Sequence, residues 1–175
     1  MRTEVTTNRR HQSRRSFLTH CAGAIATLSA LKTTPVMAGN TQTAAETGLM
    51  KPDEAHRAAL AGEIILIDIR RPDEWQETRV GEGAIGLDMR EENFVPTLVA
   101  LRRANPGKPI ALICRTGNRT GYVTSALAKQ GFPGLVDVNE GMQGGANGPG
   151  WLKRGLPTYD GTLSNVAARR KSLLP

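Results

Sequence analysis

The chain has 175 residues and a formal net charge of +7. Residues 1–38 hold six of the 23 basic residues and one of the 16 acids, so the rest of the chain is close to neutral. This distribution argues against a nucleic-acid partner, because phosphate-binding surfaces need many clustered cations. The length suits one domain with a single core. The two cysteines, Cys21 and Cys114, are too few for a disulfide framework or a zinc site built on several thiolates.

The first 38 residues combine a basic start, an apolar run and small residues. A paired arginine lies in SRRSFL at 13–18, a mild apolar run covers 21–31, and 36–38 form a cleavage site before Gly39. The apolar run is too short to span a bilayer, which needs about 20 strongly apolar residues. Residues 1–38 thus resemble a twin-arginine export signal. We expect export of the folded protein to the bacterial periplasm, with no stable membrane insertion after cleavage. A basic tail followed by a short helix is the alternative.

The segment 39–50 is rich in threonine, alanine and glycine without periodicity, which predicts a linker. After it, apolar runs alternate with helix starts that carry proline and acids. The expected helices are 52–61, 71–75, 96–103, 120–130 and a final turn at 151–157, and the expected strands are 64–67, 84–87, 109–113 and 135–138. Their alternation predicts an α/β fold with a central parallel sheet flanked by helices on both faces.

Two segments lie outside this alternation. Residues 141–150 contain five glycines and a proline, which predicts a flexible loop or lid. Residues 161–175 include an Arg-Arg-Lys run at 169–171 and are expected to form a solvated basic tail. The folded domain is therefore expected to span residues 51–160.

The segment from Cys114 to Gly121 joins a predicted buried strand to a predicted helix. Ligands of parallel sheets bind at this carboxyl edge, and the helix start offers free N–H groups and partial positive charge. Two glycines let the chain curl and two arginines add fixed charge; they are Gly117, Gly121, Arg115 and Arg119. We expect the Cys114 thiol to lose its proton easily, and the loop to hold a small oxyanion or an anionic persulfide.

Two simpler interpretations stay open for this loop. In one, Cys114 is a buried structural cysteine; in the other, Arg115 and Arg119 form only surface ion pairs. Loop size separates two chemistries. Cysteine phosphatases place five residues between the cysteine and the binding arginine, whereas four lie between Cys114 and Arg119. The tighter ring favours a single transferable sulfur over a phosphoryl group, with phosphatase or arsenate chemistry as the alternative.

Three motifs together resemble the rhodanese family of sulfurtransferases. They are DIRRPDEW at 68–75, CRTGNR at 114–119, and Trp151 with the Gly-Leu-Pro of 155–157. The similarity runs from Lys51 to Tyr159. It implies a rhodanese-like α/β fold in which Cys114 carries sulfane sulfur, a loop binds the substrate and a strand-end pair supports the loop. The loop residues are Arg115, Thr116, Gly117, Asn118, Arg119 and Thr120, and the pair is Asp68 and Arg70.

The resemblance implies an enzyme that moves sulfane sulfur from thiosulfate or a persulfide donor to a thiophilic acceptor, through a persulfide on Cys114. Cyanide, a thiol or a partner protein is the expected acceptor. Neither a metal nor an organic cofactor is expected, because a covalent persulfide divides the transfer into two easier steps. The alternative is a persulfide carrier that relays sulfur to a partner protein without turnover on small donors.

The chain departs from the family pattern in two places. The family's Gly-His-Ile-Pro-Gly-Ala stretch reads TRVGEGA here, at 78–84, without the histidine and the proline. His56 is the only histidine after the leader, and we expect it to be solvated on an exposed helix rather than catalytic. The second departure is an insertion at 144–149, which is expected to be either a lid over the site or a spacer.

Overall fold

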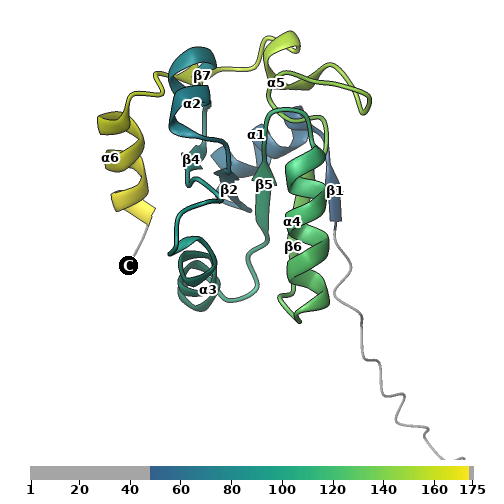
Figure 1. Ribbon diagram of the computed structural model, residues 1–175, viewed down its shortest axis with the longest axis vertical. Helices are drawn as coiled ribbons and strands as arrows, with labels where there is room; N and C mark the ends of the chain where they lie inside the picture. The colour runs from purple at the N-terminus through teal and green to yellow at the C-terminus, as the bar shows by residue number, and fades with distance from the viewer. Residues whose placement is uncertain (1–47, 174–175) are drawn as a thin grey trace, which may run out of the picture. The chain divides into compact units, whose positions relative to one another are not determined.

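The computed structural model of the protein describes residues 48–173 (Figure 1). The predicted export signal, its cleavage site and most of the predicted linker lie outside the described residues. Within 48–173, no helix combines the length and the apolar character that crossing a bilayer requires.

Five parallel strands form the central sheet, in the order β1-β6-β5-β2-β4. Their bounds are Gly48–Met50 for β1, Ile65–Asp68 for β2, Ala84–Gly86 for β4, Ile110–Ile113 for β5 and Leu135–Val138 for β6. Asp68 of β2 lies opposite Ile113 of β5, so the residues that follow both strands meet at the same carboxyl edge. A separate antiparallel pair consists of β3 (Val80–Gly81) and β7 (Thr158–Tyr159).

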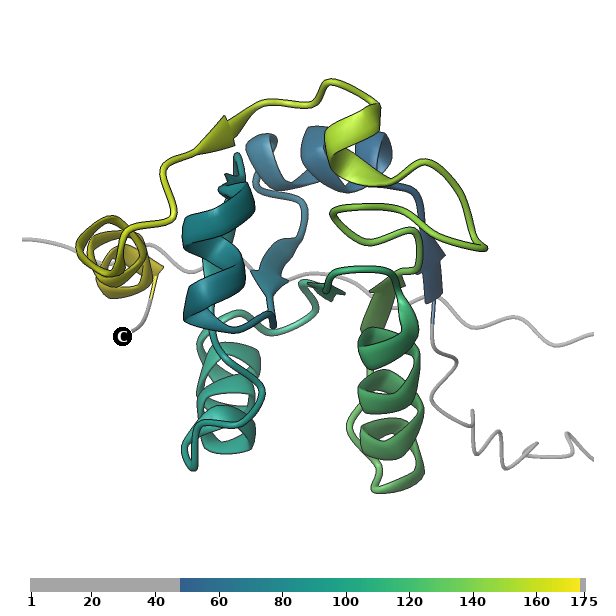
Figure 2. The ribbon, with the colours of Figure 1, turned by 45° about the horizontal axis from the view of Figure 1, so that its top comes forward.

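Helices pack on both faces of the sheet. α3 (Phe94–Ala104) and α4 (Asn118–Lys129) share one core with it. The core of the other face includes α1, α2, α5 and α6, with bounds Pro52–Leu60, Pro72–Thr78, Gly150–Lys153 and Leu163–Leu173. Figure 2 shows α3 and α4 on the side of the sheet away from α1 and α5. The predicted α/β fold with a central parallel sheet is confirmed.

The strand sequences explain why the strands are buried on both sides. Along β5, Ala111 and Ile113 face the core that includes α1, whereas Ile110 and Leu112 face the core under α3 and α4. Apolar residues at every position are what a parallel sheet with two covered faces requires. Cys114 continues the alternation and lies on the α3 and α4 side.

Several element boundaries differ from the predicted ones, and three of the differences are informative. Gly48–Met50 pairs with β6 as a strand, so the linker prediction was wrong for these residues. α4 begins at Asn118 rather than at 120, because Gly117 takes a left-handed conformation, with φ 91°, and ends the loop there. α3 begins at Phe94, which leaves Pro96 in the first helical turn, where proline is tolerated.

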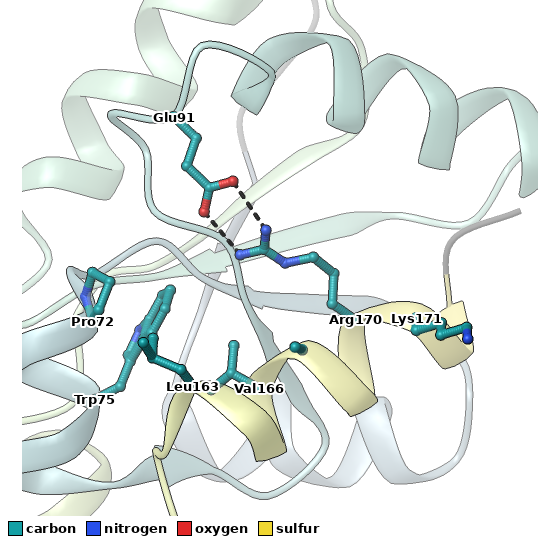
Figure 3. A pocket seen from close by; sticks show the side chains of 8 residues that line it. Pro72, Trp75, Glu91, Leu163, Val166, Arg170 and Lys171 are labelled. Atoms are coloured by element: carbon teal, nitrogen blue, oxygen red, sulfur yellow. Dashed lines mark hydrogen bonds and ion pairs between the residues drawn. The ribbon is translucent and has the colours of Figure 1, made fainter.

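The C-terminal segment is not the solvated tail that its charge predicted. It forms α6, and Val166 is buried in the same core as Trp75. Arg170 donates to the carbonyl of Gly86 on β4 at 2.8 and 3.0 Å. It also pairs with Glu91 at 2.9 Å, as Figure 3 shows. The helix therefore covers the β4 edge of the sheet, and covering an edge strand protects it from pairing with other chains.

Candidate active site

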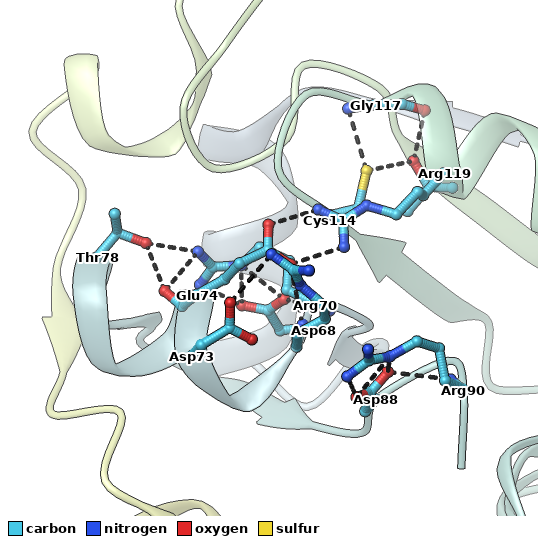
Figure 4. Close-up of polar contacts among 12 residues, drawn as sticks. Asp68, Arg70, Asp73, Glu74, Thr78, Asp88, Arg90, Cys114, Gly117 and Arg119 are labelled. Carbon is cyan, nitrogen blue, oxygen red and sulfur yellow. Dashed lines mark hydrogen bonds and ion pairs between the residues drawn. The ribbon is translucent and has the colours of Figure 1, made fainter. Parts of the chain in front are cut away.

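The Cys114 loop connects the end of β5 to the start of α4, at the carboxyl edge of the sheet (Figure 4). The Cys114 side chain is fully buried. The N–H of Gly117 donates to its Sγ at 3.2 Å. Because hydrogen bonds to a charged acceptor are the stronger ones, this amide is placed to hold anionic sulfur.

The first turn of α4 completes the surroundings of the sulfur. Thr120 is buried, its Oγ1 lies 3.7 Å from Cys114 Sγ, and its hydroxyl donates to the Gly117 carbonyl at 2.9 Å. The N–H groups of a helix's first turn have no partner inside the helix and carry partial positive charge. Cys114 therefore packs in the apolar core under α3 and α4, and an amide, a hydroxyl and a helix start meet at its sulfur there.

The glycine-rich segment at 141–150 is hydrogen-bonded to the start of the Cys114 loop. The N–H groups of Met142 and Gln143 donate to the carbonyls of Cys114 and Arg115, each at 2.8 Å. These two bonds hold the start of the glycine-rich segment against the start of the Cys114 loop.

The end of this segment is anchored as well. The buried carboxylate of Glu140 accepts hydrogen bonds from the N–H of Gly150 at 3.0 Å and from Arg154 at 2.6 and 3.0 Å. At Gly117, a side chain would overlap the carbonyl of Asn139, so both the backbone conformation and the close approach require glycine. The start and the end of the segment are thus held beside the loop, and these anchored residues support the site.

Arg119 is paired with Glu74 of α2. Its Nη1 and Nη2 donate to the two carboxylate oxygens of Glu74 at 2.8 and 2.6 Å. Burial alone would raise the pKa of the Glu74 carboxyl, but hydrogen bonds from Arg119 and the Arg71 N–H lower it to about 2. The hydrogen bond to Glu74 raises the pKa of Arg119, and the nearby Cys114 acts in the same direction. Arg119 therefore forms an ion pair, as one of the two simpler interpretations expected. The pair does not lie on the open surface, because the Glu74 side chain is buried.

Sequence reasoning alone does not single out Glu74 as a residue of the site. The carboxylate belongs to a capping box at the start of α2, where it accepts the N–H of Arg71 at 3.1 Å. The sequence Arg-Pro-Asp-Glu at 71–74 starts α2 and so places Glu74 near the carboxyl edge of the sheet. Its partner Arg119 lies 45 residues further along, and no spacing rule connects the two.

Asp68 and Arg70 form a fully buried ion pair at the end of β2. The Nη2 of Arg70 lies 2.7 Å from Asp68 Oδ2, and its Nε donates to both carboxylate oxygens at 2.9 and 3.0 Å. The same guanidinium also donates to acceptors along and just after α2, namely the carbonyls of Glu74 and Arg79 and the hydroxyl of Thr78. The ion pair thereby holds α2 in position relative to β2. These contacts favour a structural role for Asp68 and Arg70 over a direct role in chemistry.

An open cleft of about 480 Å³ lies beside the loop. Asp88 and Arg90, which the sequence did not single out, form a pair on its wall with contacts of 2.6 and 3.0 Å. Burial alone would raise the pKa of Asp88, but hydrogen bonds from Arg90 lower it. The cleft is polar and rich in arginine; its lining residues are Arg71, Glu74, Asp88, Met89, Arg90, Arg115 and Arg119.

The other predicted residues take varied positions. Arg115 lines the cleft, Asn118 is exposed at the start of α4, and Thr116 is half-buried near Gly145. His56 packs edge-on against the Trp151 ring, with centroids 5.4 Å apart, so the expectation of an exposed histidine was wrong. In the described part of the chain, no group of three or more histidine, cysteine, aspartate or glutamate residues is arranged to hold a metal ion.

Comparison with known proteins points to one family. The Rhodanese-like domain matches residues 51–147. The uncharacterized protein RP600 of Rickettsia prowazekii is 22% identical over 98 residues, which cover 53% of this chain and 80% of that protein. The crystal structure of Rv0390 from M. tuberculosis has a TM-score of 0.51 and 22% identity, covering 65% of this chain and 98% of that one. The polysulfide-sulfur transferase homodimer of Wolinella succinogenes has a TM-score of 0.50 and 26% identity, covering 65% and 79%. The chain therefore belongs to the rhodanese-like domain family.

Proposed function

We propose that the protein is a sulfurtransferase in which Cys114 accepts sulfane sulfur from thiosulfate or a persulfide donor and passes it to a thiophilic acceptor. The observation that carries the proposal is the hydrogen bond from the Gly117 N–H to Cys114 Sγ, at the start of α4. An N–H donor fixed in place stabilises negative charge without having to reorganise. The 26% identity to a polysulfide-sulfur transferase gives further support.

The proposed reaction has two displacement steps. The Cys114 thiolate attacks the outer sulfur of the donor, a new S–S bond forms, and the donor's own S–S bond breaks as the leaving group departs with the electron pair. The acceptor then attacks the outer sulfur of the persulfide, and Cys114 leaves as the thiolate. With thiosulfate and cyanide, the products are sulfite and thiocyanate. Neither step calls for a metal or an organic cofactor, because the cysteine itself carries the sulfur between donor and acceptor.

The loop residues have different parts in this proposal. The Gly117 N–H holds the sulfur, the Thr120 hydroxyl lies beside it, and Arg115 meets the donor at the rim of the cleft. Because Cys114 is fully covered, a donor reaches its Sγ only after side chains at the rim move. Asp68 and Arg70 act through the position of α2.

Intact mass spectrometry after exposure to thiosulfate or to a small persulfide tests the proposal. We expect the wild-type protein to gain one sulfur atom, which cyanide removes, and the nearly isosteric Cys114→Ser variant to gain none. Thiocyanate release in the same samples measures turnover. A wild-type protein that gains no sulfur from either donor would contradict the proposal.

A persulfide carrier that serves a partner protein is the second candidate, and the full burial of Cys114 favours it. A covered sulfur limits exchange with small molecules, because exchange rates depend on access. The same experiment separates the two candidates. A persulfide that forms but yields no repeated thiocyanate release identifies the carrier, whereas many turnovers per protein identify the enzyme.

We also propose that residues 1–38 direct the folded protein to the periplasm by the twin-arginine route. The support is the Arg14-Arg15 pair ahead of a mild apolar run, followed by residues 36–38, which match the pattern of a cleavage site. Cell fractionation tests this, with Arg14→Lys/Arg15→Lys as the matched variant that keeps the charge but removes the pair. Equal export of both forms would contradict the proposal.

A further inference from the structure

Glu74 neutralises the charge of Arg119, which lies near the end of the Cys114 loop. Arg119 donates to both of its carboxylate oxygens, at 2.6 and 2.8 Å, and the Nε of Arg71 lies 3.4 Å from the same carboxylate. The pKa of Glu74 is lowered to about 2, so the carboxylate keeps its charge throughout the physiological range. Two guanidiniums on this side of the cleft therefore face a permanent negative charge.

The pair of charges that Arg90 and Asp88 form in the cleft lining is balanced in the same way. The Nη2 of Arg90 lies 2.6 Å from Asp88 Oδ2, and its Nε donates to Oδ1 at 3.0 Å. Within 48–173, Arg115 is the arginine of this cleft that makes no ion pair. The cleft thus offers an incoming anion much less positive charge than its four guanidiniums would suggest.

We infer that Glu74 sets the charge of the sulfur donor: by neutralising Arg119 beside Cys114, it favours donors with at most one negative charge over the dianion thiosulfate. The donor class that fits is an organic or protein persulfide. This inference rests on the proposed function and specifies the donor for the same site.

The charge of the donor matters because the nucleophile of the proposed reaction is a thiolate. Thiosulfate brings two negative charges towards a thiolate, and an unpaired guanidinium would offset that repulsion. In this cleft the dianion meets the Glu74 carboxylate next to the arginine. A protonated persulfide, R–S–SH, brings no charge at all.

The two half-reactions show the same difference when their charges are counted. With a persulfide, Cys114–S⁻ and R–S–SH give Cys114–S–SH and R–S⁻; the donor's S–S bond breaks, its electron pair leaves with R–S⁻, and the proton stays on the transferred sulfur. With thiosulfate, Cys114–S⁻ and S–SO₃²⁻ give Cys114–S–S⁻ and SO₃²⁻. The second reaction gathers three negative charges in the cleft, and the first gathers one.

The test compares the second-order rates at which thiosulfate and 2-hydroxyethyl persulfide load sulfur onto Cys114, measured by intact mass, in the wild-type protein and Glu74→Gln. Glutamine keeps an oxygen that can accept the Arg71 N–H. We expect the ratio of the thiosulfate rate to the persulfide rate to rise by about tenfold in Glu74→Gln. In the wild-type protein, the same ratio should rise with salt, because screening weakens repulsion between charges.

Asp73→Asn is the matched control. It removes the same formal charge from the same helical turn, but Asp73 is exposed and pairs with Arg71 instead of Arg119. We expect it to leave the ratio unchanged. An unchanged ratio in Glu74→Gln, an equal change in Asp73→Asn, or an equal loss of both rates in Glu74→Gln would overturn the inference. A wild-type protein that both donors fail to load defeats the proposed function as well, so the two failures are distinguishable.

Discussion

Glu74 and Arg119 join the two layers of helices across the carboxyl edge of the sheet, through hydrogen bonds of 2.6 and 2.8 Å. Glu74 belongs to α2, whose Trp75 is buried in one core, and Arg119 belongs to the first turn of α4, whose Val123 is buried in the other. The pair therefore fixes the start of α4 relative to α2, and the Cys114 loop lies directly before that start. Removing either partner leaves a charge that is at least partly buried without compensation.

The Glu74 pair should give the protein a characteristic acid dependence. The pKa of Glu74 falls from 4.5 to about 2 on folding, so its contribution to stability is full above pH 4.5 and is lost as the pH falls through about 2. This contribution is at most about 3 kcal/mol, since solvent screening reduces it. Urea unfolding between pH 2 and pH 7 measures it. We expect the stability difference between wild type and Glu74→Gln to shrink towards pH 2, and a constant difference would contradict this account.

Gly117→Ala should damage the site and the fold together. Its φ of 91° is a conformation that other residues adopt at a cost, and a Cβ there would overlap the Asn139 carbonyl. The N–H that contacts Cys114 Sγ would have to move. Gly107→Ala is the control, because its φ is similar, at 81°, and nothing lies within 4 Å of the added carbon. We expect Gly107→Ala to cost about 1–2 kcal/mol and to load sulfur normally, whereas Gly117→Ala loses more stability and loads little sulfur. Equal effects would contradict the close-packing argument.

Most of the fold could be predicted because its signals are local. The runs that became β2 and β5 are apolar at nearly every position, and proline with acids marks the starts of α1 and α2. α6 was missed for a physical reason. Its one buried side chain, Val166, gives no periodic apolar stripe, and its arginines resemble a solvated tail until Glu91 and the Gly86 carbonyl are placed beside them.

The site was predictable only where it is contiguous in sequence. The segment from Cys114 to Thr120 itself contains the amide, the hydroxyl and the helix start that surround the sulfur. Its composition could therefore predict this part of the site. The partner of Arg119 comes from another helix, and the sequence of the loop carries no trace of it. The anchoring of the glycine-rich segment was missed for a related reason, because glycine suggests mobility until its backbone bonds to Arg115 and Cys114 are known.

Arg70→Met should be among the most destabilising single changes in the domain. Arg70 and Asp68 are both fully buried, and without the guanidinium the Asp68 carboxylate is left without its main partner. Breaking one side of a buried pair typically costs about 3–5 kcal/mol. Urea unfolding at pH 7 measures the loss. The control is Arg103→Met on α3, an exposed arginine with no ion pair in the described part of the chain, which should leave the midpoint unchanged. A small effect at Arg70 would mean that the pair is not a significant support of α2.

Asp137→Asn should stabilise the protein at neutral pH. Asp137 lies on β6, is 6% exposed, and its Oδ1 has no hydrogen-bond partner. Burial raises its pKa, and the nearby Thr120 hydroxyl offsets this only in part. A carboxyl whose pKa rises on folding supports stability below its unfolded pKa and loses that support as the pH rises through its folded pKa. Asparagine avoids the cost of burying the charge, so the variant should gain stability at pH 7 and lose that advantage below pH 4.

Asp160→Asn, at an exposed position, is the isosteric control and should show neither effect. An Asp137→Asn advantage that does not change with pH would show that the carboxyl is not charged and buried at neutral pH.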